Sequence, residues 1–207
     1  YHLNLGEIIM NPLNSRAGTL GAGVGAALIA IAVLGPRGSI NLLEIFVLLH
    51  VIVGIAWVGI LYYFNGIQVP AVGDALADGE PGPAAINKYI APRALFWFRW
   101  AAVLTWLTGT MALESLHGAP GSGVVAAFTF ADNFELIGMG AWLGTIMMLN
   151  VWILIWPNQQ KILGLKEASA EEIITAKFVA LMASRTNVVL SIPMLLGMTG
   201  QMHGMPF

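Results

Sequence analysis

The sequence predicts an all-α integral membrane protein, a bundle of five transmembrane helices that forms a single domain over residues 1–207. Of the 207 residues, 57% are hydrophobic and only 10% are charged, whereas a soluble domain carries about 25% charged residues because its surface must meet water. Five stretches are also apolar over roughly 20 residues, the length that a helix needs to cross a hydrocarbon core of about 30 Å. The apolar surface therefore requires a lipid bilayer as its solvent.

The predicted spans are residues 17–35, 42–64, 94–113, 135–156 and 178–199. The first follows Asn14-Ser15, which is typical of a helix N-cap, and contains Gly21 and Gly25, a spacing that lets another helix approach closely. A cleaved signal peptide is the alternative interpretation of this first segment.

Prolines mark the last two spans. We expect the fourth helix to stop at Pro157 and the fifth to kink at Pro193, because proline lacks an N–H and its ring clashes with the preceding turn. Between these spans, residues 166–172 predict a short surface helix.

The basic residues predict an orientation, because cytoplasmic loops of membrane proteins are enriched in Lys and Arg. Five crossings place the N-terminus, residues 65–93 and residues 157–177 on one side. That side holds seven basic residues, counting Arg99 just inside the third span, and the other side holds Arg37 alone, with Arg185 set aside as intramembrane. The N-terminus is therefore predicted to be cytoplasmic and the C-terminus to lie on the outer side.

Charge and cysteine content exclude several functions. The net charge of −2 provides no basic field for nucleic acid, and no nucleic-acid-binding motif is present. The sequence contains no cysteine, which excludes disulfides, iron–sulfur ligation and thiol chemistry within these residues.

His50 is the leading candidate for a functional side chain. It lies about eight residues into the second span from the outer face, hence roughly 12 Å deep at 1.5 Å per residue. Ionisable groups in lipid are costly and usually face a bundle interior or a functional site, and a neutral imidazole is a common haem ligand. Gly54, one turn later, leaves room for a flat group, and Trp57 continues the same face. The alternative is a structural histidine, hydrogen-bonded to Glu44 or to a backbone carbonyl of a neighbouring helix.

A second haem ligand must lie at nearly the same depth as the first. His203, at the outer end of the last span, is the candidate, and with His50 it forms the predicted metal-ligand pair, although by residue count it is the shallower of the two. Met194 and Met198 could supply a thioether ligand instead, but methionines in such helices commonly serve as packing. His117 also lies at the outer end of a span, where solvation is the simpler interpretation.

Arg185 lies nearer the middle of the membrane and needs a partner. Asn150, a backbone carbonyl, a haem propionate or a lipid head group could provide it. We therefore include Arg185 among the candidate cofactor-binding residues, with a structural hydrogen-bond hub as the alternative.

Three sets of segments together resemble a known family. They are residues 49–59 with 62–64, residues 97–100 with 105–109, and residues 150–161 with 184–193. These segments resemble the transmembrane N-terminal domain of the bacterial membrane-bound urate oxidase family, in which that domain precedes a C-terminal cytochrome c. The helix that contains His50 is also similar to that of the membrane protoporphyrinogen oxidase family. The Pro157-Asn158-Gln159-x-Lys161 element is the most specific part of the resemblance.

The sequence also departs from the family pattern. Gly138 stands where the family often carries a histidine, and Thr186-Asn187-Val188 stands where it often has His-Asn-Asn. His50 matches the first family histidine, and His203 lies near the final one. The family domain usually has more helices, and the absence of cysteine leaves no attachment motif for a c-type haem.

The resemblance implies a multi-pass protein of the bacterial inner membrane. It favours a subunit associated with a respiratory or photosynthetic electron-transfer complex, with b-type haem or quinone bound near His50. Its partners would be other membrane protein subunits, with a cytochrome c as one candidate. The main alternative is a non-catalytic structural subunit of a larger membrane complex, which the departures at Gly138 and Thr186 favour, and a urate oxidase is the third interpretation.

Overall fold

The computed structural model describes residues 11–35, 40–116 and 121–205, and in these ranges all regular secondary structure is helical. This confirms the predicted all-α class. Four helices in the described part are long and apolar enough to cross a membrane, namely Arg16–Leu34, Leu42–Asp78, Glu135–Ile162 and Ala170–His203. Their composition indicates association with a lipid bilayer. His117 and Arg37 lie outside the described residues.

The chain divides into two compact units, Tyr1–Ile40 and Asn41–Phe207. The first contains a single turn of 3₁₀-helix, η1 (Pro12–Asn14), followed by helix α2 (Arg16–Leu34). The Ser15 side chain accepts a hydrogen bond from the backbone N–H of Gly18 at 2.9 Å. This bond satisfies one of the free donors of the first turn, and it confirms Ser15 as the N-cap of the first predicted span.

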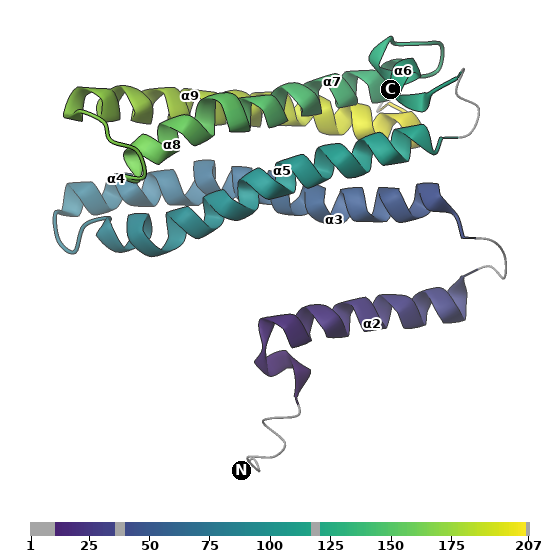
Figure 1. Ribbon diagram of the computed structural model, residues 1–207, viewed down its shortest axis with the longest axis horizontal. Helices are drawn as coiled ribbons and strands as arrows, with labels where there is room; N and C mark the ends of the chain where they lie inside the picture. The colour runs from purple at the N-terminus through teal and green to yellow at the C-terminus, as the bar shows by residue number, and fades with distance from the viewer. Residues whose placement is uncertain (1–10, 36–39, 117–120, 206–207) are drawn as a thin grey trace. The chain divides into compact units, whose positions relative to one another are not determined.

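The second unit is built from four long helices packed in two pairs. Helix α3 (Leu42–Tyr63) lies along α5 (Ala91–Glu114), and α7 (Glu135–Asn150) lies along α9 (Ala170–His203). Figure 1 shows these pairs as two layers of the second unit. A short helix, α6 (Gly123–Phe128), packs on the ends of α5 and α7 within the predicted loop.

Three turns of π-helix each precede a proline by two residues. They are η2 (Phe64–Gln68) before Pro70, η3 (Ile86–Ile90) before Pro92, and η4 (Val151–Ile155) before Pro157. In each case the residue before the proline donates its N–H to the carbonyl five positions back instead of four. The wider turn removes the clash that a proline ring makes with the carbonyl four residues earlier.

The prediction that the fourth helix stops at Pro157 was therefore wrong. The helix continues through η4 into α8 (Trp156–Ile162) because the π-turn accommodates the ring. In the same way, α3 continues through η2 into α4 (Val69–Asp78), well beyond the predicted end at residue 64.

The predicted surface helix over residues 166–172 is also absent from the structure. Residues 163–169 form turns and extended chain, and Glu171 and Glu172 belong to the first turn of α9. Ser169 and Glu172 form a capping box, in which each side chain bonds the backbone N–H of the other. This capping box explains why α9 begins at Ala170. The helix then remains α-helical through Pro193.

The third predicted span is helix α5, which begins and ends within three residues of the prediction. It is not among the four helices that are apolar enough to count as spans. Arg99, together with the tryptophans and threonines of this helix, lowers its mean hydropathy. Arg99 stacks on the Trp156 ring with its Cζ atom 3.2 Å from the ring centroid.

Helices α7 and α9 approach each other through glycines. A Cβ atom built on Gly197 would lie 2.7 Å from the backbone nitrogen of Gly140, and one on Gly140 would lie 3.1 Å from that of Met198. Side chains at these positions would force the helices apart. Small residues of this kind allow close backbone contact in membrane bundles.

A buried amide pair, Asn150 and Asn187, joins the same two helices ten residues from the glycine contact. Asn187 is fully buried; its Nδ2 donates to the Met147 carbonyl at 3.1 Å and its Oδ1 accepts from Asn150 Nδ2 at 2.7 Å. Asn150 Nδ2 also donates to the Ala183 carbonyl at 2.9 Å. These bonds fix the register of α7 against α9, because any slip would leave polar groups unpaired in an apolar core.

We expect Asn187→Leu to destabilise the bundle by about 1–2 kcal/mol, the range for interhelical hydrogen bonds in membranes. Thermal unfolding of the detergent-solubilised protein, followed by circular dichroism, measures the change. Thr186→Val is the matched control, because Thr186 is exposed and next in sequence. Equal stability of the two variants would show that the amide pair does not hold the helices in register.

Candidate functional site

His50 is bonded to the neighbouring helix through one ring nitrogen. Its Nδ1 lies 2.8 Å from the backbone carbonyl oxygen of Thr105 in α5. A carbonyl can only accept, so Nδ1 carries the hydrogen and donates it. The neutral ring then has its lone pair on Nε2, which has no hydrogen-bond partner among the described residues. This is the arrangement found in metal-ligating histidines, whose second nitrogen is held by a carbonyl or carboxylate.

Gly109 makes this bond possible. A Cβ atom on Gly109 would lie 2.8 Å from Cε1 of His50 and 2.9 Å from its Nδ1, so the imidazole occupies the place of a side chain at position 109. Gly109 was not predicted from the sequence as a partner of His50. Its position four residues after Thr105 is the signal that could have identified it, since residues four apart share a helix face.

Gly54 and Trp57 serve the helix interface in this chain. A Cβ atom on Gly54 would meet the Thr105 Cγ2 atom at 3.7 Å, an ordinary contact, so Gly54 faces α5. Trp57 is only 2% exposed and belongs to the main hydrophobic core, where its indole N–H has no partner. No hydrogen bond joins either residue to the His50 ring, whose bond goes to Thr105.

Two hydrogen bonds between α3 and α9 fix the relative height of these helices. Asn65 Nδ2 donates to Ser184 Oγ at 2.8 Å, and the Tyr62 hydroxyl lies 2.9 Å from Ser191 Oγ. The bonds pair residue 65 with 184 and residue 62 with 191, so α3 and α9 run antiparallel. The Tyr62–Ser191 bond therefore provides a reference level from which the positions of other residues along the bundle axis can be measured.

His50 and His203 lie at nearly the same height when measured from this level. His50 is twelve residues before Tyr62 in α3, and His203 is twelve residues after Ser191 in α9. At 1.5 Å per residue, each lies about 18 Å from the bond in the same direction. Measured from the Asn65–Ser184 bond instead, His50 is level with Thr199, and His203 lies about one turn, or about 6 Å, further along α9.

Figure 1 accordingly shows the start of α3 and the end of α9 at the same end of the second unit. His203 is exposed and makes no hydrogen bond or ion pair with the described residues, so no bond joins it to His50. The fold thus brings the two histidines to one end of the bundle without direct pairing.

The two methionines considered as ligands pack against glycines of α7. The Met198 Sδ and Cγ atoms would each lie 3.2 Å from a Cβ on Gly140, and both methionines approach Gly144. Met194 is 5% exposed and belongs to the core. Both side chains therefore fill the α7–α9 interface.

Arg185 lies far from the two histidines along the bundle. Arg185 follows Ser184, which bonds Asn65, so Arg185 lies close to the level of Asn65. Asn65 is fifteen residues after His50. The separation along the bundle is about 22 Å at 1.5 Å per residue. Arg185 is exposed, and Asn150 bonds Asn187 and Ala183 instead of Arg185.

Gly138 has no room for the histidine that the family often carries there. A Cβ atom on Gly138 would lie 2.3 Å from the carbonyl oxygen of Ala127 in α6. The short helix α6 therefore closes this position by direct backbone contact, and the departure from the family pattern has a structural cause.

Neither of two surface cavities on the described part of the second unit includes the histidines. The larger is a groove of about 600 Å³ between α7–η4 and α9, lined mainly by apolar side chains with Asn150 and Thr186 as its polar members. The smaller, of about 220 Å³, lies between α8 and the first turns of α9.

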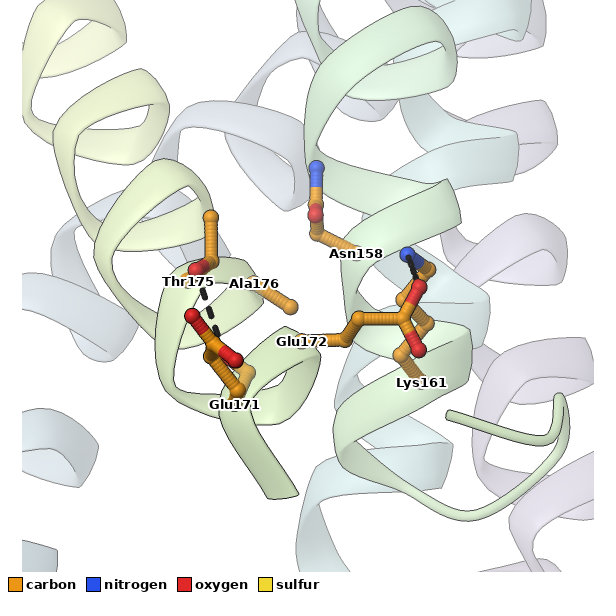
Figure 2. A pocket seen from close by; sticks show the side chains of 6 residues that line it. All are labelled: Asn158, Lys161, Glu171, Glu172, Thr175 and Ala176. Carbon is orange, nitrogen blue, oxygen red and sulfur yellow. Dashed lines mark hydrogen bonds and ion pairs between the residues drawn. The ribbon is translucent and has the colours of Figure 1, made fainter. Parts of the chain in front are cut away.

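Figure 2 shows the smaller cavity, which contains an ion pair between Lys161 Nζ and Glu172 Oε1 at 3.3 Å. Asn158 lines the cavity and donates from Nδ2 to the Leu154 carbonyl at 2.8 Å. Asn158 and Lys161 belong to the Pro-Asn-Gln-x-Lys element, so this element connects α8 to the start of α9.

A family model described as urate oxidase N-terminal matches residues 119–207, which is less than half of the chain. The match includes α6 to α9 and supports the resemblance to that family over this part of the chain. His50 lies outside the matched residues. The chain matches no curated protein and no solved structure, so the similarity to the membrane protoporphyrinogen oxidase family is not confirmed.

We expect Gly109→Ala to destabilise the bundle by about 1–3 kcal/mol, the usual cost of overpacking, because its methyl group would displace the His50 ring. Gly54→Ala is the matched control: it lies in the same helix interface with space for a methyl group, and alanine gains about 0.5–1 kcal/mol of helix propensity over glycine. Thermal unfolding of both variants in detergent tests the difference. A Gly109→Ala protein as stable as Gly54→Ala would contradict the seating of the His50 ring on Gly109.

Proposed function

We propose that the chain is a membrane subunit of an electron-transfer complex, respiratory or photosynthetic, and that His50 and His203 are the axial ligands of a b-type haem. The observation that supports this proposal is that α3 and α9 bring the two histidines to the same end of the bundle, level when measured from the Tyr62–Ser191 bond and about one turn apart when measured from the Asn65–Ser184 bond. Axial ligands of one haem must lie at nearly the same depth.

The residues present fit a haem iron in two respects. A neutral His50 would have its lone pair on Nε2, because its Nδ1 hydrogen is donated to the Thr105 carbonyl. His203 is exposed at the end of its helix and has no competing bond in the described structure. A haem bound here would supply one-electron transfer.

A quinone fits the same site less well. Because the Nδ1 hydrogen of His50 is already donated to Thr105, the neutral ring can only accept at Nε2. It could accept a hydrogen bond from a quinol hydroxyl but could not donate one to a quinone carbonyl. The chemistry of the ring thus favours a metal ion or a quinol.

Other subunits are a necessary part of this proposal. Neither described cavity encloses His50 or His203, and the side chains that flank His50 in α3 are largely exposed, with Leu49 at 42% and Val51 at 48%. A cofactor at this end of the bundle would need cover from lipid or from a partner protein. A cytochrome c on the outer side is the partner that the family resemblance favours.

The second candidate function is a non-catalytic structural subunit. The specific observation in its favour is that His50 is used in helix packing, with one nitrogen bonded to Thr105 and its ring seated on Gly109. The backbone contact of Gly138 with Ala127, which excludes the family histidine, also favours it. A urate oxidase is the weakest candidate, because the family model matches less than half of the chain and Gly138 has no room for the family histidine.

We further propose that α5 crosses the membrane as the third of five spans, with the N-terminus cytoplasmic and the location the bacterial inner membrane. Helix α5 has 24 residues, which suffice for a crossing, and it lies along α3 for most of its length. Its arginines lie at or near the end that the basic loops place in the cytoplasm.

Single-cysteine labelling tests this topology, because the chain has no native cysteine. We expect Asp78→Cys and Lys166→Cys, both exposed, to react with a membrane-impermeant maleimide only after cells are opened. Asp132→Cys, also exposed, should react in intact spheroplasts. If α5 does not cross, Asp132→Cys would be labelled from the same side as Asp78→Cys.

An absorption spectrum tests the haem. We expect the native complex to show a Soret band and a b-type pyridine haemochrome, both lost in His50→Ala and His203→Ala. Thr105→Val is the control, because it removes a hydroxyl beside the site and keeps the carbonyl that binds His50. An intact assembly without a Soret band would contradict the haem. A spectrum that survives His50→Ala in an intact assembly would favour the structural subunit.

A further inference from the structure

The face of α9 that points away from the rest of the second unit carries Arg185 between apolar residues. Residues at helical spacing along this face are apolar and exposed: Ile174 by 70%, Phe178 by 65%, Val189 by 70% and Ile192 by 63%. Arg185 lies in the middle of this stripe and is itself exposed. The opposite face of α9, which includes Ala180, Asn187 and Ser191, is buried against the bundle. We call the exposed stripe the outer face of α9.

Arg185 has no partner within the described structure. The ion pair found there joins Lys161 to Glu172, and no hydrogen bond or ring contact involves Arg185. A charged side chain within a transmembrane helix is costly unless it meets an opposite charge. Arg185 therefore presents an unpaired positive charge on the outer face of α9.

Thr186, the next residue, lacks a partner as well. The other eight threonines each donate their hydroxyl to a backbone carbonyl of the preceding turn. Thr186 makes no such bond, although it lies within a regular helix. Its side chain lines the 600 Å³ groove between α7–η4 and α9. Two adjacent polar side chains thus remain unpaired at one height, one in the groove and one on the outer face.

The groove and the outer face of α9 are continuous. Phe178 belongs to both, and apart from Thr186 and Asn150 the groove wall is apolar, with Ile146, Ile153 and Leu190 among its side chains. An apolar groove of this kind beside a helix fits another transmembrane helix. Lipid chains would fill the groove too, but they offer no hydrogen-bonding group to Thr186 at this depth.

We propose that this surface binds a transmembrane helix of a different membrane protein, and that a carboxylate on that helix pairs with Arg185. Charge complementarity favours a different protein over a second copy of this chain as the source of the carboxylate. Within the described residues, the acidic side chains lie near helix ends or in connectors, and helix α2 has none. The nearest along α9, Glu172, is thirteen residues away, about 20 Å at 1.5 Å per residue. The inference deepens the proposed function and rests on it, since it describes how the subunit joins its complex.

Site-specific photocrosslinking in native membranes tests the proposal. A benzophenone amino acid at Val189, one turn from Arg185 on the outer face, should give one defined cross-linked protein. Its cross-linked peptide should be a transmembrane segment that contains Asp or Glu. We expect Arg185→Gln to abolish the cross-link and Arg185→Lys to retain it. Arg93→Gln, which removes an exposed arginine from another helix, is the matched control and should leave the cross-link unchanged.

A charge exchange completes the test. Arg185→Glu should abolish the cross-link, and replacement of the partner's carboxylate by arginine should restore it. Cross-links to lipid alone, to a second copy of this chain, or at undiminished yield in Arg185→Gln would each overturn the proposal. The spectrum of the same membranes separates this result from the haem, because a missing Soret band with an intact, charge-dependent cross-link would refute only the cofactor.

Discussion

The hydrogen bonds from Asn65 to Ser184 and between Tyr62 and Ser191 fix the height of α3 against α9, and the placement of each candidate site follows from that register. In an apolar medium, a helix pair without such bonds could slide with little cost, because lipid is as favourable as a neighbouring leucine. The same two bonds bring His50 and His203 to one end of the bundle, level by one bond and about one turn apart by the other, and separate His50 from Arg185 by about 22 Å. One interface therefore sets the positions of both candidate sites.

The sequence was sufficient to predict most of the long helices, since their apolar length has a direct physical cause. The capping residue Ser15 could likewise be predicted locally. Helix continuation through Pro157 could not. Whether a proline ends a helix depends on whether the preceding turn can widen, and that choice is made by packing: Val151 and Ile155 in η4 are both buried in the core, where an interrupted helix would leave backbone groups unpaired.

At the candidate site, too, some features could be predicted from the sequence and others could not. A histidine in an apolar span could be identified as exceptional from the sequence, but its partner could not. The bond to the Thr105 carbonyl requires that Gly109 lack a side chain and that α5 cross α3 at that turn. The relative height of His50 and His203 could not be predicted for a similar reason, because the register of α9 against α3 depends on the bonds of Ser184 and Ser191.

Helix length relates the two ends of the bundle to the bilayer. The continuous helix Leu42–Asp78 has 37 residues and α9 has 34, about 56 and 51 Å at 1.5 Å per residue, against a hydrocarbon core of about 30 Å. Upright helices of these lengths would extend about 26 and 21 Å beyond the hydrocarbon. The ion pair of Lys161 with Glu172, shown in Figure 2, and the capping box at Ser169 lie at an end where these extensions are polar. Because Arg185 lies about 22 Å from His50 along the bundle, a hydrocarbon core of about 30 Å can hold both residues, one toward each face. A charge in that position is costly without an opposite charge, which the proposed carboxylate of another membrane protein would supply.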